Sequence, residues 1–203
     1  MVEAVEKRGR YVLGLTGMPG SGKSTARKIL EEMGCYALDA DALAHEVLDL
    51  PETLSKIAVL FGEEVIKEGK VDRPALAHLV FKDSQKLQSL NDIVHPEVRR
   101  LARERIESAP ANGVVVYDVP LLFETSLDKD MDGTLVIECD FSVRLERVRQ
   151  RGWSEQQLQD RDQHHFSDKA ARADYVVQNN TDLKALQTGL EAVLHQIKEE
   201  IQK

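Results

Sequence analysis

Cysteines and long apolar runs are scarce in this chain. Its 203 residues include two cysteines, Cys35 and Cys139, whose number and spacing exclude a disulfide framework and a cysteine-based zinc site. No apolar run approaches the roughly 20 residues that cross a bilayer. Residues 1–10 are charged and lack the apolar core of a secretory signal. We therefore expect a soluble, cytoplasmic protein in a reducing compartment.

Basic residues are also fewer than acidic ones. The chain has 27 lysines and arginines against 35 acidic residues, a formal net charge of −8. A field of that sign disfavours loose binding to nucleic acid and to anionic membranes, so we expect neither as a partner. An anionic ligand would have to be held by locally clustered basic side chains. The length predicts one domain with an insertion, and we expect a monomer or a weak homo-oligomer.

The strongest motif is the glycine-rich segment 17–25, GMPGSGKST, which fits G-x-x-x-x-G-K-[ST]. It follows an apolar run, 11–15, that predicts a buried strand, and precedes residues 25–33, where apolar side chains recur at helical spacing. Strand, glycine loop and helix are the context in which this pattern indicates a phosphate-binding loop. Glycines let successive backbone N–H groups point into one concavity that holds phosphate oxygens. We therefore expect the chain to bind a nucleoside triphosphate together with Mg²⁺.

Individual residues of this motif have predicted roles. Lys23 is expected to reach the terminal phosphates, and the Ser24 hydroxyl to take a coordination position on Mg²⁺. Asp118, which ends the apolar run 114–117, is predicted to lie beside the same Mg²⁺. The residues of the loop predicted to bind the nucleoside triphosphate, which the resemblance below implies is ATP, are Gly17, Gly20, Ser21, Gly22, Lys23, Ser24 and Thr25.

Apolar, strand-like runs alternate with helical patterns along the whole chain. This alternation predicts an α/β fold, a P-loop NTPase core with a five-stranded parallel sheet flanked by helices. The predicted strands are residues 11–15, 35–38, 114–117, 134–139 and 175–177, and a closing amphipathic helix is predicted over 183–201.

The predicted domain has three parts. The core is expected to comprise residues 11–42, 110–143 and 173–203. The block 43–109 is almost wholly helical in pattern and is predicted to form a helical lobe over the open end of the sheet, which the resemblance given below implies is the acceptor lobe. The polar helical block 144–172 is predicted to form a lid.

Two carboxylates, Asp39 and Asp41, close the second predicted strand. Residues two apart on an extended segment point the same way, so both side chains could face the phosphate loop. A carboxylate there could accept a hydroxyl proton during phosphate transfer or hold Mg²⁺ through water. Alternatively, either could cap the helix predicted to follow, because aspartate is a preferred N-cap.

Arg144, Arg147 and Arg151 are spaced three and four residues apart, which places them on one helical stripe. Like charges at that spacing repel unless an anion lies between them, so the stripe favours a lid over phosphates. A solvated face with partners such as Glu146 is the alternative. His95 taken alone is more typical of a structural histidine, and the apolar segment 120–124 more typical of core than of a pocket wall.

Taken together, these motifs resemble the dephospho-CoA kinase family, from Tyr11 to about Thr181. Many unrelated ATPases and GTPases share the phosphate loop, so the resemblance depends on the order and spacing of other pieces. These pieces are Asp39-Ala40-Asp41, Phe61-Gly62, Val71-Asp72-Arg73, Leu90-Asn91, His95-Pro96, Val119-Pro120-Leu121-Leu122-Phe123-Glu124, Arg147, Arg151, Gln163, Ala173-Asp174 and Asn179. In one departure, many members have Gly-Gly-Ile-Gly where this chain has Gly17-Met18-Pro19-Gly20, which stiffens the entry to the loop.

The resemblance implies transfer of the γ-phosphate of ATP to the ribose 3′-hydroxyl of dephospho-CoA, giving coenzyme A and ADP. Asp41 would be the base, and Lys23, Arg147 and Arg151 would stabilise charge on the transferring group. The resemblance also assigns ATP contacts to Arg147, Arg151 and Asn179. It assigns contacts with dephospho-CoA to Asp41, His95, Leu121, Leu122 and Glu124.

Two other functions compete with this interpretation. A nucleoside or nucleoside monophosphate kinase would have the same fold and an acceptor bound under a helical lobe. A GTP-dependent switch protein would carry D-x-x-G after an apolar strand and N-K-x-D later in the chain. Here the D-x-x-G at 130–133 follows the polar residues 127–129, and N-K-x-D does not occur. The switch function is therefore disfavoured.

Overall fold

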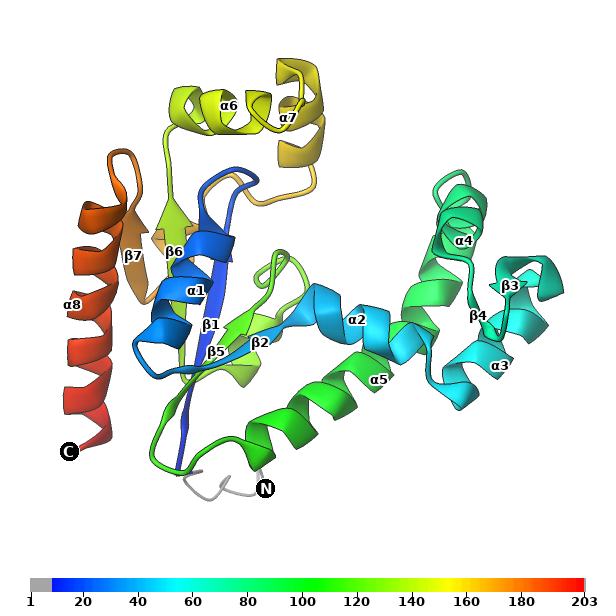
Figure 1. The fold of residues 1–203 in the computed structure, drawn as a ribbon, viewed down its shortest axis with the longest axis horizontal. Coiled ribbons are helices and arrows are strands. Elements are labelled where there is room, and N and C mark those ends of the chain that lie inside the picture. The colour runs from blue at the N-terminus through cyan, green and yellow to red at the C-terminus, as the bar shows by residue number, and fades with distance from the viewer. Residues whose placement is uncertain (1–8, 203) are drawn as a thin grey trace. The chain divides into compact units, whose positions relative to one another are not determined.

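The computed structural model describes residues 9–202. The chain divides into two compact units (Figure 1): one takes in the chain up to Leu38 and from Ala109 onward, and the other is Asp39–Ser108. In the described part of the chain, no helix combines the length and the apolar character that crossing a membrane requires.

A five-stranded sheet in the order β2-β5-β1-β6-β7 organises the first unit. Its strands are β1 (Tyr11–Gly17), β2 (Tyr36–Asp39), β5 (Val114–Asp118), β6 (Gly133–Glu138) and β7 (Tyr175–Gln178). β1 pairs in parallel with both β5 and β6, and β6 pairs in parallel with β7. The predicted α/β fold with a five-stranded parallel sheet is therefore confirmed.

The central strands are apolar because both faces of the sheet are covered. β1, β5 and β6 are buried along nearly their whole length, as parallel strands covered by helices must be. Two helices, α1 (Lys23–Glu32) and α8 (Leu183–Ile201), contribute apolar side chains to one core cluster with these strands. Gly14 of β1 packs against the loop after β5, because a Cβ there would lie 2.9 Å from Leu122 Cδ2.

Two helices, α6 (Phe141–Arg149) and α7 (Glu155–Asp162), follow β6 (Figure 1). We call residues 141–162 the helical arm. Val148 and Leu158 are buried between its helices, and Trp153 packs against them. Ser154 caps α7, since its hydroxyl accepts a hydrogen bond from Gln157 N while the Gln157 side chain bonds to Ser154 N. Two short 3₁₀ segments, η2 (Leu127–Asp130) and η3 (Ala170–Arg172), complete the first unit.

The second unit is mainly helical. It contains α2 (Ala40–Leu48), α3 (Pro51–Phe61), η1 (Glu63–Val65), β3 (Ile66–Lys67), β4 (Lys70–Val71), α4 (Arg73–Val80) and α5 (Ser84–Ser108). Its core is formed by Ile57, Phe61, Val65, Val71, Leu76 and Val80. α5 has 25 residues and contains Pro96, whose missing N–H removes one helical hydrogen bond just after His95.

Candidate active site

The phosphate loop between β1 and α1 has the backbone form that the motif predicts. Gly20 and Gly22 adopt positive φ angles of 81° and 94°, a region that side chains disfavour. Both are also closely packed: a Cβ on Gly20 would lie 2.9 Å from Val148 Cγ1, and one on Gly22 would overlap the Asn179 amide. α1 then begins at Lys23, so the N-terminal end of the helix, with its backbone N–H groups, adjoins the loop. The segment is built to receive an anion.

Lys23 contacts a carboxylate at the end of the neighbouring strand. Its Nζ binds the Asp118 carboxylate, and Arg27 Nε lies 3.3 Å from Asp118 Oδ2. Asp118 is 3% exposed, so its charge is buried and matched by two cations. The structure thus brings together two residues predicted for the ATP and Mg²⁺ sites, and adds Arg27, which the sequence analysis did not single out.

The residues at this position fit Mg²⁺. Ser24 is exposed in the first turn of α1, and it follows Lys23, whose Nζ binds the Asp118 carboxylate. The two residues predicted to hold the metal therefore offer one hydroxyl and one carboxylate. Such hard oxygen donors are what Mg²⁺ prefers. In the described residues, no group of three or more His, Cys, Asp or Glu could hold a metal by itself. A site with few protein ligands is typical of Mg²⁺ that is bound jointly with substrate phosphates.

Asn179, Arg147 and Ser21 meet beside the loop. Asn179 Nδ2 donates to the Ser21 carbonyl at 2.7 Å, and Arg147 Nη2 donates to Asn179 Oδ1 at 3.4 Å. Arg147 Nη1 also lies 3.4 Å from the Ser21 carbonyl and from Cys139 Sγ. Three residues predicted to bind ATP are therefore in mutual contact. Asn179 is only 6% exposed, so its observed contact is with the loop backbone.

The predicted arginine stripe is not present in the structure. Arg144 is 6% exposed and bonds to both carboxylate oxygens of Asp162 at 2.9 Å, while its Nη1 donates to the Pro19 carbonyl at 3.0 Å. α6 ends at Arg149, because the chain turns there toward Gly152 at φ 81°. Arg151 therefore lies outside the helix and is exposed. Of the three arginines, Arg147 alone combines partial exposure with a contact to the phosphate loop, whereas Arg144 links the helical arm to that loop.

In the second unit, Asp39 and Asp41 have different surroundings. β2 ends at Asp39, whose Oδ1 accepts hydrogen bonds from Asp41 N at 2.9 Å and Ala42 N at 3.2 Å. Asp39 is thus the N-cap of α2. The expectation that both side chains point the same way from an extended segment is wrong, because the helix begins at Ala40. Asp41 is exposed in the first turn of α2.

His95 lies on α5 of the second unit with part of its ring exposed. Burial of the rest of the ring, and then the nearby Arg99, lower the pKa of His95 below its ordinary value. The imidazole is therefore neutral at neutral pH and can donate or accept a hydrogen bond.

The segment after β5 is partly core. Leu122 is completely buried against Gly14, whereas Leu121 is half-buried. Glu124 Oε1 accepts a hydrogen bond from Phe166 N at 2.7 Å and lies 2.8 Å from Lys169 Nζ. Burial would raise the pKa of Glu124, but hydrogen bonds from Lys169 and the Phe166 N–H outweigh it and leave that pKa lowered. In this structure the Leu122 side chain and the Glu124 carboxylate are engaged with the protein itself.

Several residues of this region escaped sequence reasoning. Arg27, Asp162 and Lys169 are single charged side chains whose partners lie far away in the sequence.

A parallel α/β sheet, a phosphate loop leading into a helix and an adjoining arginine-bearing arm define a P-loop nucleotide-binding enzyme. The family model described as Dephospho-CoA kinase matches residues 11–185. The chain belongs to the dephospho-CoA kinase family, and it is an enzyme, a kinase.

Relatives and a solved structure agree with this assignment. The chain is 40% identical over 190 residues to a dephospho-CoA kinase of Deinococcus radiodurans, covering 91% of each chain. It is 35% identical over 179 residues to one of Fusobacterium nucleatum, covering 86% of this chain and 92% of the relative. The crystal structure of TT1252 from Thermus thermophilus superposes with a TM-score of 0.82 at 36% identity, covering 92% of this chain and 97% of that one.

Proposed function

We propose that this kinase transfers the γ-phosphate of ATP to the ribose 3′-hydroxyl of dephospho-CoA, giving coenzyme A and ADP in the last step of coenzyme A synthesis. The observation that carries the proposal is the family match over residues 11–185, which includes the phosphate loop, Asp41 and the helical arm.

On the ATP side, the N–H groups of the loop and of the first turn of α1 would hold the phosphates. Lys23 would contact the terminal phosphates from its position beside Asp118. The loop residues Gly17, Gly20, Ser21, Gly22, Ser24 and Thr25 complete this contact surface. Ser24 and Asp118 would hold Mg²⁺, which when bound neutralises charge on the phosphates.

Arg147 and Arg151 would stabilise negative charge on the transferring group. Arg147 is supported by its position, because its guanidinium already lies against the Ser21 carbonyl at the edge of the loop. Arg151 is exposed just beyond α6 and would reach the phosphates from the helical arm. Planar guanidinium groups suit this role because they bind phosphate oxygens with two parallel hydrogen bonds.

On the acceptor side, Asp41 would accept the proton of the 3′-hydroxyl. A general base needs a carboxylate that is free to meet the substrate, and Asp41 is exposed whereas Asp39 caps α2. His95, neutral because of its lowered pKa, would hydrogen-bond to dephospho-CoA from α5. Leu121 would make apolar contact with dephospho-CoA. Leu122 and Glu124, whose side chains contact the protein itself, would hold the segment 120–124 in its conformation.

We further propose that the enzyme works in the cytoplasm, without nucleic-acid or membrane partners, as a monomer or weak homo-oligomer. The net charge of −8 supports the first part, because it repels polyanionic surfaces. Cys35 and Cys139 are both free and buried, which is consistent with a reducing compartment.

The decisive experiment is ADP release by the purified protein with ATP and Mg²⁺, comparing dephospho-CoA, adenosine and AMP as acceptors. Turnover with dephospho-CoA alone is the expected result. Turnover with adenosine or AMP in its place would retain the phosphate site but move the assignment to a nucleoside or nucleotide kinase. Omitting Mg²⁺ should abolish turnover, and if it does not, the Ser24 and Asp118 assignment is incorrect.

A further inference from the structure

A lysine with no role in the preceding scheme lies buried in the first unit. Lys169 follows the helical arm and immediately precedes η3, and it is 2% exposed. Its Nζ donates to the Pro120 carbonyl at 2.9 Å, to Glu124 Oε2 at 3.1 Å and to Thr16 Oγ1 at 3.4 Å, and it lies 2.8 Å from Glu124 Oε1. An ammonium group has three N–H donors, and this carbonyl, carboxylate and hydroxyl can accept all three.

The three acceptors belong to segments that carry the proposed chemistry. Thr16 is the residue before Gly17, where the phosphate loop begins, and its hydroxyl donates to the Pro120 carbonyl at 3.0 Å. Pro120 and Glu124 bound the segment that follows Asp118 and contains Leu121. Lys169 therefore fastens the segment 120–124 to the end of β1.

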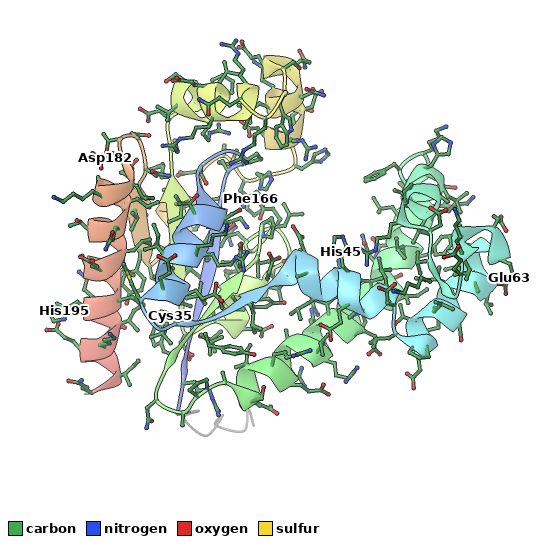
Figure 2. The ribbon with its side chains drawn as sticks, viewed as in Figure 1. Cys35, His45, Glu63, Phe166, Asp182 and His195 are labelled. Atoms are coloured by element: carbon green, nitrogen blue, oxygen red, sulfur yellow. The ribbon has the colours of Figure 1, made fainter. Side chains whose placement is uncertain are left out.

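The same contact includes the chain that returns from the helical arm. Phe166, labelled in Figure 2, donates its backbone N–H to Glu124 Oε1 at 2.7 Å, three residues before Lys169. Glu124 thus receives a backbone donor and a side-chain donor from one short segment, and its carboxylate is engaged inside the protein.

Joining two segments by a lysine and a carboxylate that are removed from water costs folding free energy, because both charges lose their hydration. An apolar pair would hold the segments together at lower cost, but it would not fix the Pro120 carbonyl and the Thr16 hydroxyl at defined positions. The pair is therefore better explained by the geometry it imposes than by the stability it adds.

We propose that Lys169 is a positioning residue that holds the segment 120–124 in the conformation needed to bind the acceptor nucleotide. The inference rests on the proposed function, since 120–124 is the predicted acceptor wall. The phosphate loop has separate attachments, from Asn179 to Ser21 and from Arg144 to Pro19. Loss of Lys169 should therefore weaken acceptor binding while leaving ATP binding nearly intact.

The test is steady-state kinetics of Lys169→Met, Glu124→Gln and the double variant, at a temperature well below the Tm of each. We expect Lys169→Met to raise KM for dephospho-CoA by about tenfold or more, because small displacements of positioning groups have large kinetic effects. KM for ATP should change less than about twofold, because its loop keeps its own hydrogen bonds. The double variant should be no worse than either single variant, since both act through one pair. Lys184→Met, an exposed lysine at the start of α8, is the matched control.

Three results would overturn the proposal. Variants with a lower Tm but unchanged kinetic constants would show that the pair is only structural, and so would additive effects in the double variant. Equal rises in both KM values would show that Lys169 does not act on the acceptor in particular. If the single variants do not fold, the double variant, which buries no unpaired charge, provides the comparison.

Failure of the proposed function gives a different result. In that case the wild-type enzyme itself does not phosphorylate dephospho-CoA. The ratio of the two KM values is then measured with the acceptor that the wild type does phosphorylate, and the same outcomes decide the role of Lys169.

Discussion

Asn179 holds the backbone of the phosphate loop at Ser21, with its amide Nδ2 2.7 Å from the Ser21 carbonyl. The two residues are 158 positions apart in the sequence, and both are buried. This hydrogen bond joins the loop backbone to the residue that follows β7, and so restrains the conformation of the loop.

Replacing Asn179 should therefore weaken ATP binding. Asn179→Ala leaves a buried carbonyl without its main donor, a loss of about 1–3 kcal/mol. We expect KM for ATP to rise by about tenfold or more. Asn179→Asp should be at least as harmful, because a carboxylate would face the carbonyl oxygen. Gln196→Ala, on the exposed face of α8, is the control, and an unchanged KM for ATP in Asn179→Ala would refute the role.

Lys23→Met should lower kcat by about 10²–10³-fold, the usual effect of removing one donor that stabilises transition-state charge. The protein should still fold, because Arg27 Nε remains 3.3 Å from Asp118 Oδ2 and keeps that buried carboxylate paired. Thermal unfolding and ADP release measure the two effects separately. Lys28→Met, an exposed lysine on the same helix, should behave as wild type. Near-normal turnover in Lys23→Met would contradict the phosphate role.

Replacing each of the two aspartates at the start of α2 should have a different effect on kcat. Asp41→Asn should reduce kcat by about 10²–10⁴-fold with little effect on ATP affinity, because a base acts on the chemical step. Asp39→Asn should stay close to wild type, since asparagine caps a helix as well as aspartate does. The reverse pattern would make Asp39 the base.

The ion pair of Arg144 and Asp162 should stabilise the helical arm and hold Arg144 where it bonds to the Pro19 carbonyl of the phosphate loop. Arg144→Met would leave Asp162 without a bidentate partner and free the Pro19 carbonyl, destabilising the protein by about 3 kcal/mol. In a double-mutant cycle with Asp162→Asn, measured by urea unfolding, we expect strong non-additivity. Purely additive values would mean that the two side chains act independently.

The stability of the protein should fall between neutral and mildly acidic pH partly because of His165. Its ring is half-buried with Nδ1 lacking a hydrogen bond, and burial, followed by Lys169, lowers its pKa below the ordinary 6.5. Since the folded state resists protonation, the unfolded state binds the proton first, and stability is lost as pH falls below 6.5 toward the lowered folded value. His165→Gln should flatten this part of the curve of unfolding free energy against pH. An unchanged curve would show that other groups cause the loss.

The strands and the phosphate loop could be predicted from the sequence because each depends on a local pattern. The apolar run 11–15 became β1, and the glycine positions of the loop follow directly from the motif. Element ends were less predictable: β2 gives way to α2 at Asp39 because one side chain caps a helix there.

The contacts that fix the candidate site could not be read from local patterns. Lys169 with Glu124 and Arg144 with Asp162 are single charged residues joined only by the folded chain. Composition favours solvent exposure for such side chains, so tertiary structure alone shows that Lys169 and Arg144 are buried and paired.

The pairing of Lys23 with Asp118 also affects which anions the phosphate loop should prefer. Because this ammonium is already paired with a neighbouring carboxylate, its attraction for a further anion is reduced. A small anion that met Lys23 alone would therefore gain little. A triphosphate would also meet the backbone N–H groups of the loop and the arginines of the helical arm. We therefore expect the loop to prefer a nucleoside triphosphate to small cellular anions.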